Sequence, residues 1–136
     1  MNWEYSCGAV VFTRQNGQIL YVIVQEKSGA YSFPKGHVEG SETEMDTARR
    51  EISEETGLQP AFLPGFCHRE EYHLSEKPGT WKRVTYFLAE FENQSLVAQE
   101  SEIRNILLLP YEQAYSLFPY ENTRQVLAAA HAFLTK

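Results

Sequence analysis

The stretch that decides the fold runs from Gly36 to Leu58 and reads GHVEGSETEMDTARREISEETGL. Its second half has the pattern of a single helix. Ser41 followed three residues later by Glu44 is a capping box, which predicts that the helix begins at Glu42. Gly57 can adopt the left-handed conformation that commonly ends a helix. The sequence therefore predicts one helix with both of its ends specified.

One edge of this helix carries three carboxylates. The apolar residues at helical spacing, which would face a core, are Met45, Ala48 and Ile52. At about 100° per residue, Glu51, Glu54 and Glu55 fan out beside that stripe. Glu51 and Glu55 are a like-charged i,i+4 pair, and the helix dipole disfavours anions in the last turn. An arrangement this poor for stability indicates function, and Mg²⁺ or Mn²⁺ prefers such oxygen ligands. The alternative interpretation is a solvated acidic face.

The whole stretch resembles the signature of the Nudix hydrolases, G-x5-E-x7-R-E-U-x-E-E-x-G-U, in which U is a bulky aliphatic residue. The matching residues are Gly36, Glu42, Arg50, Glu51, Ile52, Glu54, Glu55, Gly57 and Leu58. The resemblance implies the α/β class, as an α/β/α sandwich with a mixed β-sheet. It also implies metal-dependent hydrolysis of a nucleoside diphosphate linked to another group.

Length and composition indicate one Nudix domain over residues 1–136. The hydrophobic content of 43% and the charged content of 22% are typical of a soluble globular protein. No apolar run approaches the ~20 residues of a membrane span, and the first residues lack the pattern of a signal peptide. A cytoplasmic location without membrane contact is expected. Cys7 and Cys67 lack metal-ligand spacing, and we expect both to be reduced core residues.

The net charge of −6 would repel a polyphosphate unless cations gather at the site. Metal ions and a few local lysines or arginines would have to supply that attraction. Because no basic stripe is present, a small-molecule nucleotide is the expected partner and duplex nucleic acid is not. A monomer and a homodimer both stay open.

The remaining chain alternates strand and helix patterns. Strands are expected over 5–12, 19–26, 82–92 and 106–109, with one or two more in 60–74. Asn16-Gly17 suggests a hairpin turn between the first two. Two helices are expected over 111–118 and 122–135, the second packing inward through Val126, Leu127, Ala130, Phe133 and Leu134.

Hydrolysis of a phosphoric anhydride needs an in-line water, charge neutralisation and a proton acceptor. By the family resemblance, Glu54 is the favoured general base, and some branches of the family recruit a glutamate from a later loop. Glu102 is the better alternative of that kind and Glu100 the weaker one. The implied metal ligands are the three helical carboxylates, the carbonyl of Gly36 and Glu102. Their residues are Gly36, Glu51, Glu54, Glu55 and Glu102.

Beyond the signature, the chain is similar to the asymmetric diadenosine tetraphosphate hydrolases of this family. The segments that carry the similarity are Ser6-Cys7-Gly8, Pro34 to Glu39, Gly65-Phe66, Tyr86 to Glu90 and His131 to Leu134. The resemblance implies that Tyr86 and Phe133 sandwich an adenine, and Tyr72 resembles a further tyrosine of that branch. Lys35 and His37 flank the glycine and are candidates for phosphate contact. The departures from the branch pattern are Tyr31, Phe33-Pro34 and Gly40-Ser41.

The predicted reaction is water attack on a terminal phosphate of diadenosine tetraphosphate, giving AMP and ATP. The alternatives are clearance of oxidised or other nucleoside triphosphates, as in MutT-like pyrophosphohydrolases, and removal of pyrophosphate from RNA 5′ ends. A nucleotide-binding sensor without turnover is the non-enzymatic alternative. The intact carboxylates of Glu51, Glu54 and Glu55 argue against a sensor.

Overall fold

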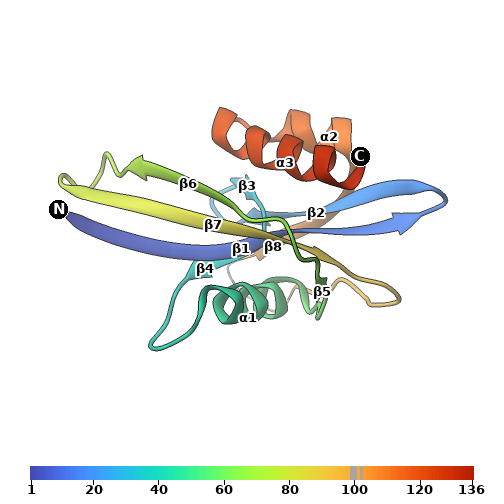
Figure 1. Cartoon of the computed structure of the whole chain (residues 1–136), viewed down its shortest axis with the longest axis horizontal. Helices are drawn as coiled ribbons and strands as arrows, with labels where there is room; N and C mark the ends of the chain where they lie inside the picture. The colour runs from blue at the N-terminus through green and yellow to red at the C-terminus, as the bar shows by residue number, and fades with distance from the viewer. Residues whose placement is uncertain (99–100, 102) are drawn as a thin grey trace.

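The computed structural model describes residues 1–98, 101 and 103–136. In chain order the elements are β1 (Asn2–Gln15), β2 (Gln18–Glu26), β3 (Tyr31–Ser32), β4 (Lys35–His37), α1 (Glu44–Thr56), β5 (Ala61–Phe62), β6 (His68–His73), β7 (Thr80–Glu90), β8 (Ile103–Pro110), α2 (Tyr111–Leu117) and α3 (Glu121–Leu134). The described strands form one mixed eight-stranded sheet, with helices on both of its faces (Figure 1). The predicted α/β/α sandwich is confirmed.

The sheet is built around β1 and β7, which run parallel from Asn2 opposite Thr80 to Phe12 opposite Glu90. Along its other edge β1 changes partner. Its residues 6–8 pair with β4, and its residues 12–15 pair with β2. The two partner strands therefore separate beside the middle of β1. The candidate site lies at this separation.

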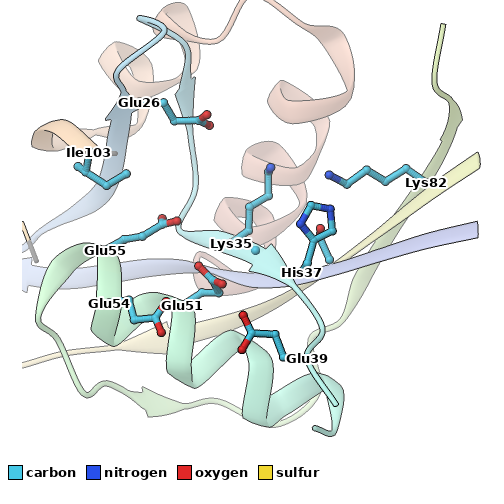
Figure 2. A pocket seen from close by; sticks show the side chains of 11 residues that line it. Glu26, Lys35, His37, Glu39, Glu51, Glu54, Glu55, Lys82 and Ile103 are labelled. Carbon is cyan, nitrogen blue, oxygen red and sulfur yellow. The ribbon is translucent and has the colours of Figure 1, made fainter. Parts of the chain in front are cut away.

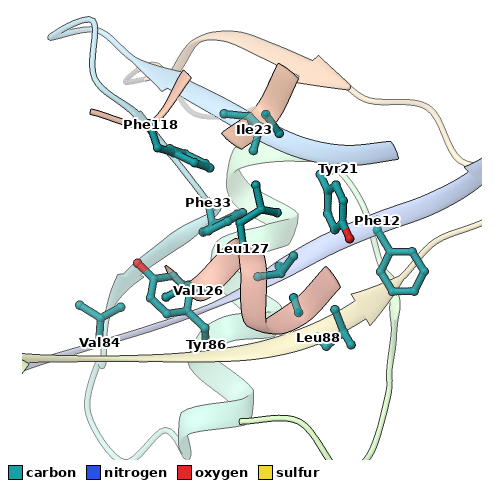
Figure 3. Packing of buried hydrophobic residues seen from close by; sticks show 13 residues of the cluster. Phe12, Tyr21, Ile23, Phe33, Val84, Tyr86, Leu88, Phe118, Val126 and Leu127 are labelled. Atoms are coloured by element: carbon teal, nitrogen blue, oxygen red, sulfur yellow. The ribbon is translucent and has the colours of Figure 1, made fainter. Parts of the chain in front are cut away.

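Helix α1 covers one face of the sheet, and α2 and α3 cover the other (Figure 1). The cluster under α1 contains Ala9, Val11, Val22, Ile52, Leu58, Ala89 and Phe91. The cluster under α2 and α3 is larger and rich in aromatic rings, with Phe33, Tyr86, Phe118 and Leu127 packed together (Figure 3). Residues of β7 alternate between the two clusters, as the period of two in its sequence predicts.

Helix α1 ends as predicted but begins later than predicted. Gly57 has a φ of 75° and donates its N–H to the Ser53 carbonyl at 2.9 Å. The N-cap is Thr43, which forms a capping box with Asp46. The predicted box of Ser41 and Glu44 is therefore wrong. The reason is that Glu42 lies outside the helix, where its carboxylate binds other groups.

The other predicted elements occur with shifted ends. Asn16 and Gly17, with φ of 53° and 78°, form a two-residue turn between Gln15 and its partner Gln18. The region 60–74 contributes β5 and β6, and β8 and both C-terminal helices lie where expected. No helix in the described part of the chain is long and apolar enough to cross a bilayer.

The two cysteines lie in different environments. Both are free thiols, and Cys7 is buried in β1. Cys67 is exposed in the loop before β6, so the prediction that it is a core residue is wrong. This loop joins β5 to β6, which both pair with β7, and it leaves the thiol exposed to solvent.

Candidate active site

A cavity of about 460 Å³ opens where β2 and β4 separate (Figure 2). Its lining is strongly charged: Ser6, Glu26, Lys35, Gly36, His37, Glu39, Glu51, Glu54, Glu55, Lys82 and Ile103. Glu51, Glu54 and Glu55 reach it from the last turns of α1, and Lys35 to His37 reach it from β4. The structure thus brings together the helical carboxylates and the residues around Gly36 that the sequence singled out.

Gly36 lets the helix carboxylate approach the sheet. Its backbone pairs with Cys7 of β1, and a Cβ atom added at this position would overlap the carboxylate of Glu51. Any side chain here would push α1 away from β4 or turn Glu51 out of the cavity. The glycine of the signature is therefore required by close packing.

Arg50 is the centre of an ionic network on the outer side of this cavity. Its guanidinium donates to Glu42 Oε2 at 2.7 Å, to Glu51 Oε2 at 2.9 Å and to Glu54 Oε2 at 3.2 Å. It also donates to the His37 carbonyl at 2.9 Å. Arg50 therefore pairs with three carboxylates of the signature. The network fixes the edge of α1 to the strand that carries Gly36.

Glu42 completes this network from the loop before α1. Its carboxylate accepts hydrogen bonds from the Glu39 N–H at 3.0 Å and from the Thr47 hydroxyl at 2.9 Å, besides both bonds from Arg50. The Arg50 hydrogen bonds are the main reason that its pKa falls to about 2. Glu42 therefore holds the loop to the helix and does not line the acidic cavity.

Glu51 and Glu55 lie too close together for two bare charges. Burial and the neighbouring Glu51 charge raise the pKa of Glu55 to about 8, although the Lys35 N–H donates to its carboxylate. Burial also raises the pKa of Glu51, which hydrogen-bonds Glu55. Within the described residues, Glu55 Oε1 is buried without a hydrogen-bond partner. Crowded carboxylates with an unpartnered oxygen fit a divalent cation.

The carboxylates are nevertheless not arranged as a finished metal site. In the part of the chain that the structure describes, no three carboxylate, imidazole or thiol groups converge on one point. Arg50 holds one oxygen each of Glu51 and Glu54. The chemistry of the donor set fits Mg²⁺ or Mn²⁺, while ligation by Gly36, Glu51, Glu54 and Glu55 stays a prediction.

Cations line the wall opposite the helix. Lys35 and Lys82 extend into the cavity from β4 and β7 (Figure 2). Burial and the charge of Lys35 lower the pKa of Lys82. His37 also lines the cavity, with its Nε2 3.6 Å from Glu4 Oε1. Two ammonium groups that repel each other are well suited to an anionic ligand such as a phosphate.

A second cavity, of about 620 Å³, shares Glu26, Lys35 and Lys82 with the first. Its remaining lining includes four tyrosines, which are Tyr31, Tyr72, Tyr86 and Tyr120. Tyr72 comes from β6, and Tyr120 comes from the junction of α2 and α3, where 71% of the residue is exposed. The acidic cavity thus continues past two lysines into an aromatic one.

Tyr86 and Phe133, the predicted base-stacking pair, each pack against another aromatic ring. Tyr86 is 2% exposed, and its ring lies 5.6 Å from that of Phe33 in the core. Phe133 packs on Phe66 at 5.7 Å, outside the lining of either cavity described above. Tyr86 nonetheless lines the tyrosine cavity, so its buried ring forms part of that cavity's wall. Tyr72 lines the tyrosine cavity as well, and the assignment of Tyr86 and Phe133 to base stacking stays a prediction.

Two predicted residues lie outside the described part of the chain, and some cavity residues were not predicted from the sequence. Glu100 and Glu102 lie outside the described residues, so their roles stay predictions. Among the cavity residues that sequence reasoning missed are Glu26, Glu70, Lys82 and Tyr120. The alternation of β7 gave a signal for Lys82, which shares its face with Val84. No local sequence pattern indicated the other three, because they come from separate parts of the fold.

Comparisons with known proteins agree with this fold. Residues 5–130 match the NUDIX domain family. The asymmetrical bis(5′-nucleosyl)-tetraphosphatases of Mus musculus and Sus scrofa are 30% and 32% identical over 141 residues, which cover 95% of this chain and 94% of each relative. The crystal structure of a C. elegans Ap4A hydrolase binary complex has a TM-score of 0.88 at 25% identity, covering 96% of this chain and 97% of that one. The family match, the signature helix and its acidic cavity together place this chain in the Nudix family of pyrophosphohydrolases.

Proposed function

We propose that this Nudix hydrolase cleaves dinucleoside tetraphosphates asymmetrically, converting diadenosine tetraphosphate to AMP and ATP with a divalent metal ion, in the cytoplasm. The observation that carries the proposal is the continuity of the acidic and tyrosine cavities through Glu26, Lys35 and Lys82. A nucleoside joined to a long phosphate chain matches this order of aromatic, cationic and acidic groups. The mouse and pig relatives, whose names carry this activity, support it.

The tyrosine cavity would take a nucleoside. Tyr31, Tyr72 and Tyr120 offer aromatic faces there, and stacking of a base on such a ring is worth about 1–3 kcal/mol. Tyr120 is mostly exposed, so a base can reach it without disturbing the core. This cavity, with the Tyr86 ring in its wall, is the proposed base site.

The phosphate chain would lie along Lys35 and Lys82, with His37 beside it. Their positive charges would offset the repulsion from a chain whose net charge is −6. Because the two lysines line both cavities, they would hold the phosphates between the base and the carboxylates of α1. A longer phosphate chain would therefore gain more contacts than a monophosphate.

Gly36, Glu51, Glu54 and Glu55 would hold divalent ions, which when bound supply charge neutralisation and acidify the attacking water. We propose Glu54 as the general base that takes the proton of this water. Its side chain is 44% exposed at the cavity, and Arg50 holds its Oε2 at 3.2 Å. Arg50 thereby orients the carboxylate. Glu102 is the alternative base.

The test is a panel of dinucleoside polyphosphates, nucleoside triphosphates and 5′-triphosphorylated RNA, incubated with Mg²⁺ and analysed for products. AMP plus ATP from diadenosine tetraphosphate, at a higher kcat/KM than for the other substrates, is the expected result. Monophosphate plus pyrophosphate from triphosphates as the faster reaction would instead establish a house-cleaning enzyme. No Mg²⁺-dependent cleavage of any of them would contradict the proposal.

A further inference from the structure

Three acidic side chains, Glu26, Glu70 and Glu76, line the tyrosine cavity, and the proposed reaction gives no role to Glu70. Glu70, in the middle of β6, lines this cavity, and its Oε2 is buried without a hydrogen-bond partner in the described residues. Burial raises the pKa of its carboxyl group. A buried acceptor without a donor is destabilising, because its lost hydration is not replaced. Such a group is expected to have a ligand donor available to it.

The groups around Glu70 indicate which part of a ligand could donate a hydrogen bond to its carboxyl group. β6 alternates, so Glu70 and Tyr72 face the tyrosine cavity while Arg69 and Glu71 face the other side of the sheet. The hydroxyl of Tyr86, from the adjacent strand β7, hydrogen-bonds the carboxyl group of Glu70 (Figure 3 shows the buried tyrosine). Glu70 is thus anchored on one side and lacks a partner on the other.

The cation that acts on Glu70 also lies on the proposed phosphate path. Lys35 lies close enough to favour the ionised form of Glu70 electrostatically, but it also lines the acidic cavity and acts on Glu55 in the same way. When Lys35 binds the phosphates, the Glu70 carboxyl oxygen stays available to a hydrogen-bond donor at the other end of the ligand. That end is the base beside Tyr72.

We propose that Glu70 is a specificity-determining residue, whose carboxyl group accepts a hydrogen bond from the amino group of an aminopurine bound in the tyrosine cavity. The inference rests on the proposed function, because it assumes that a base occupies this cavity. Adenine offers such a donor at its 6-amino group. A base that lacks the amino group leaves the buried carboxyl oxygen without a partner, so the site discriminates against it.

The test is a thermodynamic cycle in which one change is made in the protein and one in the substrate, each alone and both together. The substrates are diadenosine tetraphosphate and its purine riboside analogue, which lacks both 6-amino groups. The proteins are the wild type and Glu70→Met, which keeps the side-chain length and removes the acceptor. The wild type should prefer the adenine substrate by about 10-fold or more in kcat/KM, and Glu70→Met should reduce that preference to within about 2-fold. Glu70→Gln keeps a carbonyl acceptor and should retain part of it.

Glu71→Met is the matched control, since it lies on the same strand but faces away, paired with Arg83 at 2.7 Å. It should keep the wild-type preference. Thermal unfolding of each variant checks that the fold is kept. A preference in Glu70→Met equal to that of the wild type would overturn the proposal, as would a wild type that does not discriminate.

The same cycle is repeated for binding, with the Kd of AMP and of purine riboside monophosphate measured by calorimetry. This separates the two proposals. A preference in Kd for AMP that depends on Glu70, without cleavage of tetraphosphates, would overturn the proposed function and retain the role of Glu70. Cleavage to AMP and ATP, with no preference for adenine that depends on Glu70 in either kcat/KM or Kd, would retain the function and overturn the role of Glu70.

Discussion

The acidic cavity and the tyrosine cavity adjoin each other but are held together by different forces. Arg50 binds three carboxylates around the first, so that the edge of α1 is fixed by short ionic hydrogen bonds. The second is walled by aromatic rings, and its outermost ring, Tyr120, is mostly exposed. A fixed charged region suits chemistry, and an open aromatic region suits selection among ligands. Changes in the two regions should therefore have different kinetic signatures.

The largest effect is expected at the base in the acidic cavity. Glu54→Gln should lower kcat by about 10²–10⁴-fold, because a general base contributes about that much and the amide cannot accept the proton. The loss should be the same for every nucleotide that the enzyme cleaves. Steady-state kinetics on two substrates measure it, with circular dichroism to check the fold. Normal turnover by Glu54→Gln would show that Glu54 is not the general base, and Glu102 would become the favoured candidate. It would also contradict the separate kinetic roles of the two cavities.

Arg50→Met should destabilise the folded protein. The substitution leaves Glu42, Glu51 and Glu54 without their shared donor, and one hydrogen bond to a charged group is worth about 1.5–3 kcal/mol. A loss of at least that size is expected in the free energy of unfolding, measured with urea. Arg49→Met is the control, since Arg49 is exposed and stacks over Phe62 at 5.0 Å. Equal losses in the two variants would contradict a fixed acidic edge.

Tyr120→Ala should affect binding and leave the chemical step intact. Removal of one stacking ring should raise KM for diadenosine tetraphosphate by about 5–150-fold, which corresponds to about 1–3 kcal/mol. kcat should change little, because the ring would contact substrate and transition state alike. The exposed position of Tyr120 predicts an unchanged melting temperature. A fall in kcat with KM unchanged would show that the two regions do not act separately.

The contrast between the regions also explains what the sequence could predict. The acidic edge lies within one helix, where a period of 3.6 residues fixes which side chains share a face. The spacing and the family signature therefore singled out Gly36 and the three carboxylates, and these residues line one cavity. The start of the helix was missed because two overlapping patterns, at Ser41 and at Thr43, both satisfy a capping box. The competing bond of Glu42 to Arg50 spans eight residues and decides between them.

The tyrosine cavity has no such local pattern. Glu26, Glu70 and Tyr120 come from β2, β6 and the start of α3, and only the pairing of the strands brings them together. The burial of Tyr86 was missed for a related reason. Its alternation in β7 correctly predicts a face shared with Val84 and Leu88, but not that α3 covers this face. Both errors concern contacts between distant segments.

The smallest predicted effect is a pH dependence at the network that closes the acidic edge. The Glu42 pKa falls from an ordinary 4.5 to about 2, mainly through the hydrogen bonds from Arg50, so the folded state binds this proton more weakly than the unfolded state. The stabilisation is therefore fully present above pH 4.5 and is lost as the pH falls towards 2. The difference in unfolding free energy between wild type and Glu42→Gln should be constant near neutral pH and shrink across that window, as urea titrations at several pH values would measure. In the Arg50→Met background the shrinkage should largely disappear, and its persistence there would show that another group, and not Arg50, holds the Glu42 carboxylate ionised.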